Sequence, residues 1–187
     1  MDVGEFITSN QAFQCTLEIP ENATVCILDS SFNPPNFAHK KIADLCLSRF
    51  PNCILLFMLA TGNADKPAVN VASLQHRVNM MKLMASHEYT ANPKVGLALI
   101  TMPRFIDKAD AVKAILPKNE IVFAMGYDTL LRLGMQQYYS EPVTDLMKDF
   151  FSKTSVLVLA REEDGITKTP HMENASEQAE AISKNVL

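Results

Sequence analysis

A short polar stretch early in the chain combines the side chains from which an anion-binding site could be built. Residues 29–41 have the sequence DSSFNPPNFAHKK, which places serines, asparagines and a histidine between an apolar run and a helix-like segment. Helix N-termini present unpaired N–H groups and a partial positive charge, and both favour phosphate. His39, at the expected first helical turn, could direct a ring N–H at a phosphate, although an exposed helix-start histidine is the plainer interpretation. The stretch therefore predicts phosphate binding.

Five more residues could contact a phosphate or another group of a ligand, and most have an ordinary alternative. Lys66 could face a phosphate or be a solvated loop lysine. Arg77 has the planar shape that suits a phosphate or carboxylate. Gly126 would let the backbone approach a ligand, and Asp128 could bind a ribose or cap a short helix. Arg161 could reach a phosphate or form a surface salt bridge.

The elements that must position these residues alternate between strands and helices. Short apolar runs predict five interior strands, at 24–28, 53–59, 95–101, 120–125 and 155–160. The segments between and before these strands predict helices, at 38–50, 73–87, 106–116, 129–133 and 142–151. Ser73 is the expected N-cap of the second helix. The alternation predicts a doubly wound, parallel α/β sheet of five strands with helices on both faces.

The chain is expected to form one domain with two flanking segments. Its 187 residues suffice for a single core. We expect an N-terminal extension at 1–22, an α/β domain at 23–162, and a polar C-terminal segment at 163–187, expected as a loop plus one helix. Ligands of such sheets bind outside the carboxyl ends of the strands. The stretch at 29–41 follows the first strand and would lie at that edge.

Composition argues against several classes of function. The net charge of −4 argues against broad electrostatic binding of nucleic acid. No apolar run reaches the roughly 18 residues of a spanning helix, so no membrane partner is expected. The N-terminus lacks the features of a secretory signal, which predicts a cytoplasmic or nuclear protein. The four cysteines lack C-x-x-C spacing, so we expect reduced core residues and no protein-held metal.

The phosphate-binding motifs of dehydrogenases and P-loop proteins are both absent from the sequence. Instead, SSFNPPNFAH at 30–39 resembles the GSFNPxHxGH signature of the nicotinamide mononucleotide adenylyltransferases, which are nucleotidyltransferases of the H-x-G-H type. The matching positions are Ser31, Phe32, Asn33, Pro34, Pro35 and His39. The departures are Ser30 and Ala38 in place of glycines and Asn36 in place of the first histidine.

Three later stretches resemble the same family in the same order along the chain. SLQHRVNMMKLMA, from Ser73, is similar to its S-x-x-H-R-x-x-M-x-x-L-A segment. MGYDTLLRL, from Met125, is similar to its G-x-D-x-L turn, and VLVLARE, ending at Glu162, to the strand that leads into an arginine. The stretches TGNADKP and FIDKA look most similar to the fungal branch.

The resemblance implies a Rossmann-like fold and transfer of AMP from ATP, with Mg²⁺, to nicotinamide mononucleotide (NMN) or its acid analogue (NaMN), giving NAD and pyrophosphate. It implies a catalytic role for His39, with Asn36 partly replacing the missing histidine. The residues implied for ATP binding are Ser30, Ser31, Phe32, Asn36, His39, Gly126, Asp128 and Arg161. Those implied for the mononucleotide are Asn33, Lys66, Arg77 and Phe105, the last in place of a stacking tryptophan.

Such a transfer needs no protein nucleophile, because the attacking phosphate oxygen is already an anion. The protein has to align the phosphates and neutralise their charge. Asn36 can donate only a neutral hydrogen bond, and ISKNVL at 182–187 is a poor version of the family's second phosphate motif, I-S-S-T-x-x-R. We expect either that the sequence is truncated before that motif or that the motif has been lost. These two departures favour an alternative function: a catalytically weakened homologue that binds nucleotide as a sensor or scaffold.

Overall fold

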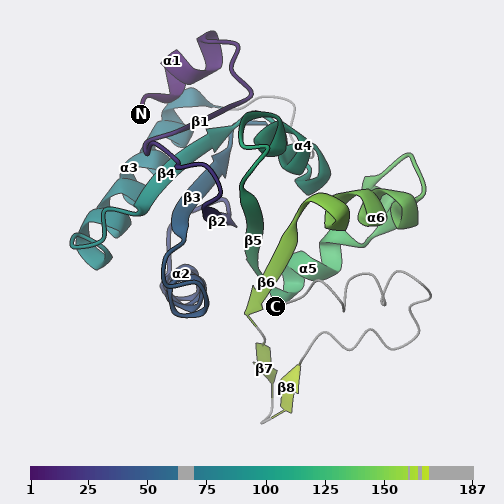
Figure 1. Cartoon of the computed structure of the whole chain (residues 1–187). Helices are drawn as coiled ribbons and strands as arrows, with labels where there is room; N and C mark the ends of the chain where they lie inside the picture. Colours follow the sequence, from purple (N-terminus) through teal and green to yellow (C-terminus); the bar gives the residue numbers. More distant parts are fainter. Residues whose placement is uncertain (63–69, 160, 164–165, 169–187) are drawn as a thin grey trace.

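The centre of the molecule is a six-stranded sheet. The computed structural model describes residues 1–62, 70–159, 161–163 and 166–168, the last two ranges by their backbone alone. The strands are β1 (Phe13–Cys15), β2 (Thr24–Asp29), β3 (Ile54–Ala60), β4 (Val95–Ile100), β5 (Glu120–Gly126) and β6 (Ser155–Leu159). Their order is β1-β4-β3-β2-β5-β6, with β2 to β6 parallel and β1 antiparallel to β4 (Figure 1). The five predicted parallel strands are confirmed, and β1 adds a sixth that the sequence did not indicate.

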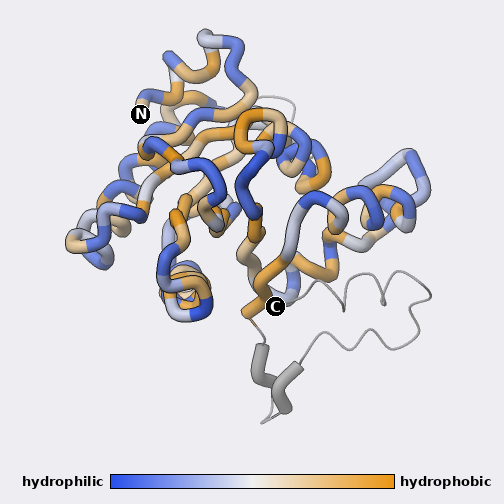
Figure 2. Tube along the Cα trace, viewed as in Figure 1, coloured by the Kyte–Doolittle hydropathy of each residue, from blue (hydrophilic) through white to orange (hydrophobic). Residues whose placement is uncertain are grey.

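Helices cover both faces of the sheet, as predicted (Figure 1). The helices on one face are α1 (Val3–Thr8), α2 (Phe37–Arg49) and α3 (Val71–Glu88), and those on the other are α4 (Phe105–Ile115), α5 (Tyr127–Leu133) and α6 (Val143–Lys153). A short 3-10 helix at Gln136–Tyr138 lies between α5 and α6. Alternate side chains of β2 enter the two cores: Cys26 and Leu28 face α1 to α3, while Val25 and Ile27 face α4 to α6. The interior strands are accordingly apolar along most of their length (Figure 2).

The start of α3 differs from the prediction. The helix begins at Val71, and its N-cap is Asn70, whose side chain accepts a hydrogen bond from the Ser73 amide at 3.3 Å. The prediction that Ser73 is the cap was wrong, because an asparagine three residues earlier is an equally good capping residue. The earlier start leaves Ser73 inside the first turn.

The N-terminal segment is built into the sheet edge rather than lying apart from it. Val3 and Phe6 of α1 are 0% and 1% exposed and belong to the core beneath α3. The Val3 amide donates to Gln75 of α3 at 2.9 Å, and Thr16, just after β1, exchanges hydrogen bonds with Leu97 of β4. Residues 1–22 therefore cover one edge and part of one face of the domain.

The C-terminal part begins with a two-stranded antiparallel hairpin, β7 (Arg161–Glu163) and β8 (Ile166–Lys168). The predicted loop-plus-helix segment thus starts as strands instead. Arg161 opens β7, two residues after Leu159, the last residue of β6. Lys66 and ISKNVL at 182–187 lie outside the described residues.

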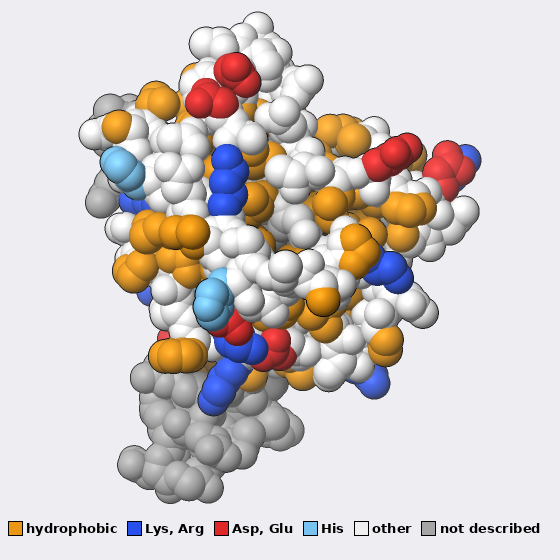
Figure 3. Space-filling model, turned by 90° about the vertical axis from the view of Figure 1, so that its left-hand side faces the viewer, with side chains coloured by type: hydrophobic (Ala, Val, Ile, Leu, Met, Phe, Trp, Pro, Cys, Tyr) orange, Lys and Arg blue, Asp and Glu red, His pale blue; other side chains and the backbone are white. Residues whose placement is uncertain are grey.

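Three observations on the described residues concern the surface charges, the helices and the cysteines. Among the described helices, none has the length and apolarity needed to span a membrane. On the face drawn in Figure 3, the described lysine and arginine side chains are scattered among acidic and hydrophobic ones. The four cysteines are free; Cys26, Cys46 and Cys53 are buried, as expected, whereas Cys15 in the edge strand β1 is only partly buried.

Because Phe6 is buried under α3, truncating it should destabilise the fold although it lies outside the predicted α/β domain. We expect Phe6→Ala to lower the free energy of unfolding by about 3 kcal/mol or more, since a large apolar side chain is lost and a cavity remains. Ile7→Ala, at the next position and 41% exposed, is the matched control, expected to change it by about 0.5 kcal/mol. Urea denaturation measures both, and equal effects would contradict the packing of α1 described above.

Candidate functional site

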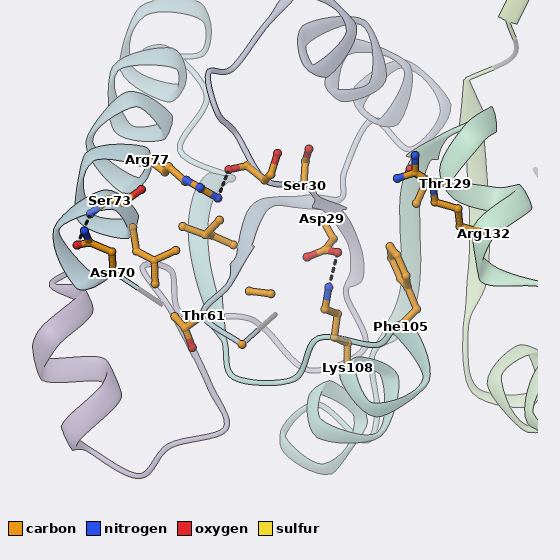
Figure 4. Close-up of a pocket in the computed structure, with 15 residues that line it drawn as sticks. Asp29, Ser30, Thr61, Asn70, Ser73, Arg77, Phe105, Lys108, Thr129 and Arg132 are labelled. Carbon is orange, nitrogen blue, oxygen red and sulfur yellow. Dashed lines mark hydrogen bonds and ion pairs between the residues drawn. The ribbon is translucent and has the colours of Figure 1, made fainter. Parts of the chain in front are cut away.

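A pocket of about 500 Å³ opens at the carboxyl edge of the central strands. Its walls come from the ends of β2 and β3 and from the first turns of α3, α4 and α5 (Figure 4). The order of the parallel strands reverses between β2 and β5, and ligands of open α/β sheets bind at such a switch point. Gly62, just after β3, lies so close to the carbonyl oxygen of Thr101 that a Cβ would not fit, which fixes where the chain leaves β3.

The predicted phosphate-binding turn is held by reciprocal hydrogen bonds between Asn36 and His39. Asn36 is the N-cap of α2, and its Oδ1 accepts from the amides of Ala38 at 3.0 Å and His39 at 3.3 Å. His39 Nδ1 accepts a hydrogen bond from the backbone N–H of Asn36 at 2.9 Å, which completes a capping box. The residue that replaces the family's first histidine therefore has a clear structural task.

The same contacts define the protonation of His39. Since Nδ1 accepts a proton donor, the neutral ring carries its hydrogen on Nε2, which lies 2.8 Å from Ser30 Oγ and donates to it. Burial lowers the pKa of His39 from its usual value of 6.5. A neutral His39 thus directs an N–H towards the start of the turn, and Ser30 receives it.

Phe32 acts through packing, because its side chain is fully buried. Its ring lies 4.9 Å from the His39 ring and 6.0 Å from Phe57, between centroids. Its φ of 43° is in the left-handed region, which is unfavourable for a residue with a Cβ. A role for Phe32 in ATP binding would have to use its backbone. Asn33, next along the turn, is exposed.

Arg77 connects α3 with the turn. Its Nη1 donates to the carbonyl oxygen of Ser31 at 3.5 Å, a long hydrogen bond. Its Nε is buried and has no hydrogen-bond partner among the described residues. Buried donors are nearly always paired in proteins, so the guanidinium has capacity left for an anion in the pocket.

An ion pair that the sequence did not reveal forms another part of the pocket wall. Lys108 of α4 contacts Asp29, the last residue of β2, with Nζ 2.5 Å from Oδ2. Both side chains are nearly buried, and both line the pocket. Asp29 stands at the head of the polar stretch quoted above, but only the fold could show which side chain it meets.

On the side of the pocket that faces away from α3, further lining residues come from α4 and α5. Phe105 lines the pocket, and its ring packs edge-on against Phe123 at 5.5 Å. Thr129 and Arg132 line it from α5, and Arg132 was also missed although it lies one turn after the predicted Asp128. Gly126 is the N-cap of α5, and a Cβ there would meet open space.

The structure therefore brings part of the predicted set into one pocket. Ser30, Ser31, Arg77 and Phe105 line it. His39 contacts Ser30 from the start of α2, which Asn36 caps, while Gly126 and Asp128 precede Thr129 at the start of α5. Among the described lining residues, three basic side chains accompany one carboxylate, an arrangement that attracts anions although the chain as a whole is acidic.

The described residues do not form a metal site by themselves. No group of three or more His, Cys, Asp or Glu side chains within the described ranges is arranged to hold an ion. Asp29, the carboxylate of the pocket wall, is already paired with Lys108. The only carboxylate among the described lining residues therefore already has an ion-pair partner.

Removing the cap at Asn36 should destabilise the start of α2. We expect Asn36→Ala to lower the free energy of unfolding by about 1 kcal/mol, because the amides of residues 38 and 39 lose their acceptor. Asn36→Asp retains an acceptor oxygen and is the control, expected to stay near the wild type. Chemical denaturation of the three proteins measures the difference, and equal stability of the alanine variant would show that the cap is unimportant.

The hydrogen bonds of His39 predict its titration. Nitrogen-15 NMR should show the Nε2–H form at neutral pH and a pKa below 6.5. Because the folded state binds the proton less well than the unfolded chain, the free energy of unfolding should decrease as the pH falls from about 6.5 through the folded-state pKa. His39→Gln should reduce that decrease. An Nδ1–H tautomer, or a pKa at or above 6.5, would contradict the geometry.

Comparison with known proteins agrees with this architecture. A Schizosaccharomyces pombe protein named as a candidate nicotinamide mononucleotide adenylyltransferase is 35% identical over 164 residues, which are 87% of this chain and 62% of that protein. A candidate nicotinate-nucleotide adenylyltransferase of Trichlorobacter lovleyi is 28% identical over 76% of this chain and 63% of its own length. The chain thus spans less than two thirds of these relatives.

Solved structures show the same fold. The nicotinic acid mononucleotide adenylyltransferase of Plasmodium falciparum complexed with NaAD has a TM-score of 0.56 at 15% identity, covering 89% of this chain and 74% of that one. The same enzyme complexed with APC gives 0.55 at 13% identity, with 89% and 73% covered. The model of the cytidylyltransferase-like family matches residues 27–176. The chain, with its doubly wound sheet and its polar turn after β2, belongs to this family of nucleotidyltransferases.

Proposed function

We propose that the protein transfers AMP from ATP to a pyridine mononucleotide, NMN or NaMN, with release of pyrophosphate. The observation that carries the proposal is the meeting of Arg77 with the signature turn in one pocket: its Nη1 contacts Ser31, and its buried Nε still lacks a partner among the described residues. The names of the S. pombe and T. lovleyi relatives support the same reaction.

In this proposal, the turn after β2 and the start of α2 hold the phosphates of ATP. Ser30 receives the Nε2 hydrogen of His39, so its own hydroxyl hydrogen is free to be donated to a phosphate oxygen. His39 positions Ser30, and the ring would donate directly to a phosphate oxygen if that oxygen took the place of the serine hydroxyl. Such fixed donors lower the barrier by stabilising charge that develops during transfer.

Arg77 and Phe105 are proposed to hold the mononucleotide. Arg77 offers a forked set of donors that matches a phosphate, and Phe105 offers an aromatic surface on the other wall of the pocket (Figure 4).

Lys66 stays a prediction for the same subsite, and Gly126, Asp128 and Arg161 stay predictions for ATP. When bound with ATP, Mg²⁺ would neutralise charge on the phosphates.

A weakened homologue that only binds nucleotide is the second candidate. The feature in its favour was Asn36, which cannot carry charge. In the structure Asn36 caps α2 and orients the catalytic candidate His39, so its presence has a structural reason that does not require loss of activity. A location in the cytoplasm or nucleus remains part of the proposal, as predicted from the sequence.

Formation of NAD from ATP, Mg²⁺ and NMN, followed by chromatography, tests the proposal. We expect product with the wild type and a loss of about 10- to 150-fold in kcat/KM with Arg77→Ala, the effect of one lost charge-assisted hydrogen bond. His76→Ala is the matched control, because His76 is the exposed neighbour on α3 and does not line the pocket. His39→Ala should also lower kcat.

Two results would contradict the proposed reaction. Absence of product, with ATP binding still measurable by calorimetry, would favour the nucleotide-binding homologue. Equal losses with Arg77→Ala and His76→Ala would show that the pocket described here is not where the mononucleotide binds.

A further inference from the structure

The Asp29–Lys108 ion pair faces the pocket with unused hydrogen-bonding capacity. Lys108 carries three N–H donors, of which Asp29 Oδ2 accepts one. No described residue donates to the other carboxylate oxygen, Oδ1, which points into the pocket (Figure 4). The two side chains are only 4% and 9% exposed, so bulk water does little to satisfy them. A ligand in the pocket would meet one donor and one acceptor side by side.

Stability alone does not account for this pair. Removing two charges from water is costly, and replacing a buried ion pair by apolar residues is often neutral or stabilising. The surrounding core is apolar: Ile106 and Ala109, which flank Lys108 in α4, are buried in the core cluster below the sheet. An ion pair at the wall of a ligand pocket, in an otherwise apolar helix face, is better explained by recognition than by packing.

The pair is complementary to one particular chemical group. A primary carboxamide is planar, with a carbonyl oxygen that accepts from Lys108 and an NH₂ group that donates to Asp29. A carboxylate could accept from Lys108, but its second oxygen would face the carboxylate of Asp29. Two neighbouring carboxylates repel each other, so the pair would disfavour binding of the acid as well as favour binding of the amide.

The pocket also contains an aromatic surface next to the pair. Lys108 Nζ lies 4.8 Å from the centroid of the Phe105 ring, which is three residues earlier on the same helix. Phe105 is fixed from behind by its edge-on contact with Phe123. A flat ring that carries the carboxamide can therefore pack near Phe105 while its amide reaches the ion pair.

We propose that Asp29 and Lys108 bind the carboxamide of an aromatic amide nucleotide and make the protein prefer NMN to NaMN. The inference rests on the proposed function and adds to it the choice between the two substrates. Asp29 sets the selectivity, because its charge cancels that of Lys108 and leaves the site neutral.

The test compares kcat/KM for NMN and for NaMN. We expect the wild type to favour NMN by about tenfold or more. In Asp29→Asn the Lys108 charge is no longer cancelled, so the NMN-to-NaMN ratio should fall by about 10- to 150-fold. Lys153→Met is the control, because Lys153 pairs with Asp110 and Asp149 on α4 and α6 and does not line the pocket. Its ratio should equal that of the wild type.

A second variant and a binding measurement keep the outcomes separate. Asp29→Leu combined with Lys108→Met leaves no buried charge, so it should fold and lose most of the discrimination. If NAD forms but the wild type prefers NaMN, or Asp29→Asn leaves the ratio unchanged, the inference fails and the proposed function stands. If neither mononucleotide gives product nor binds in calorimetry, both fail. If both bind without product, the ratio of dissociation constants decides the inference in the same way.

Discussion

Parallel strands that are buried on both faces need helices on both sides, and this requirement determines where the chemistry of this protein can lie. Because the strands are parallel, every strand ends and every following helix begins at the same edge of the sheet, so the ends of β2 and β3 and the first turns of α3, α4 and α5 meet there. The pocket lies between these strand ends and helix N-termini. Residues far apart in the sequence, such as Asp29 and Lys108, become neighbours for this reason.

At the start of α2, one set of hydrogen bonds caps the helix and also fixes the tautomer of His39. The Asn36–His39 capping box satisfies amides that the helix leaves unpaired, and it also selects the Nε2–H form of the imidazole. Phe32 supports the ring from below at the cost of an unfavourable positive φ. Strain of this kind persists where the surroundings enforce it, here a buried side chain in a turn that must hold His39 and Ser30 in register.

The features that depended on local pattern were predictable from the sequence, and those that depended on tertiary contact were not. The apolar runs predicted the five parallel strands, and the polar stretch at 29–41 indicated the turn. The short strand β1 has too few residues for a pattern and forms only against β4. Lys108 lies between buried residues of an apolar helix face, where a lysine gives no hint of its partner, and Asn70 competed with Ser73 as a cap.

The pocket is lined by one cation that is paired with a carboxylate and by two arginines that have no carboxylate partner among the described lining residues. The pairing of Lys108 with Asp29 leaves that part of the wall neutral overall. Arg77 on the α3 side and Arg132 on the α5 side have no such carboxylate partner among the described lining residues, and they stand on opposite walls (Figure 4). Each of these arginines suits a phosphate group of a ligand, whose charge it would neutralise. The neutral Asp29–Lys108 pair suits an uncharged polar group instead, so the two kinds of wall would distinguish the charged part of a ligand from an uncharged substituent.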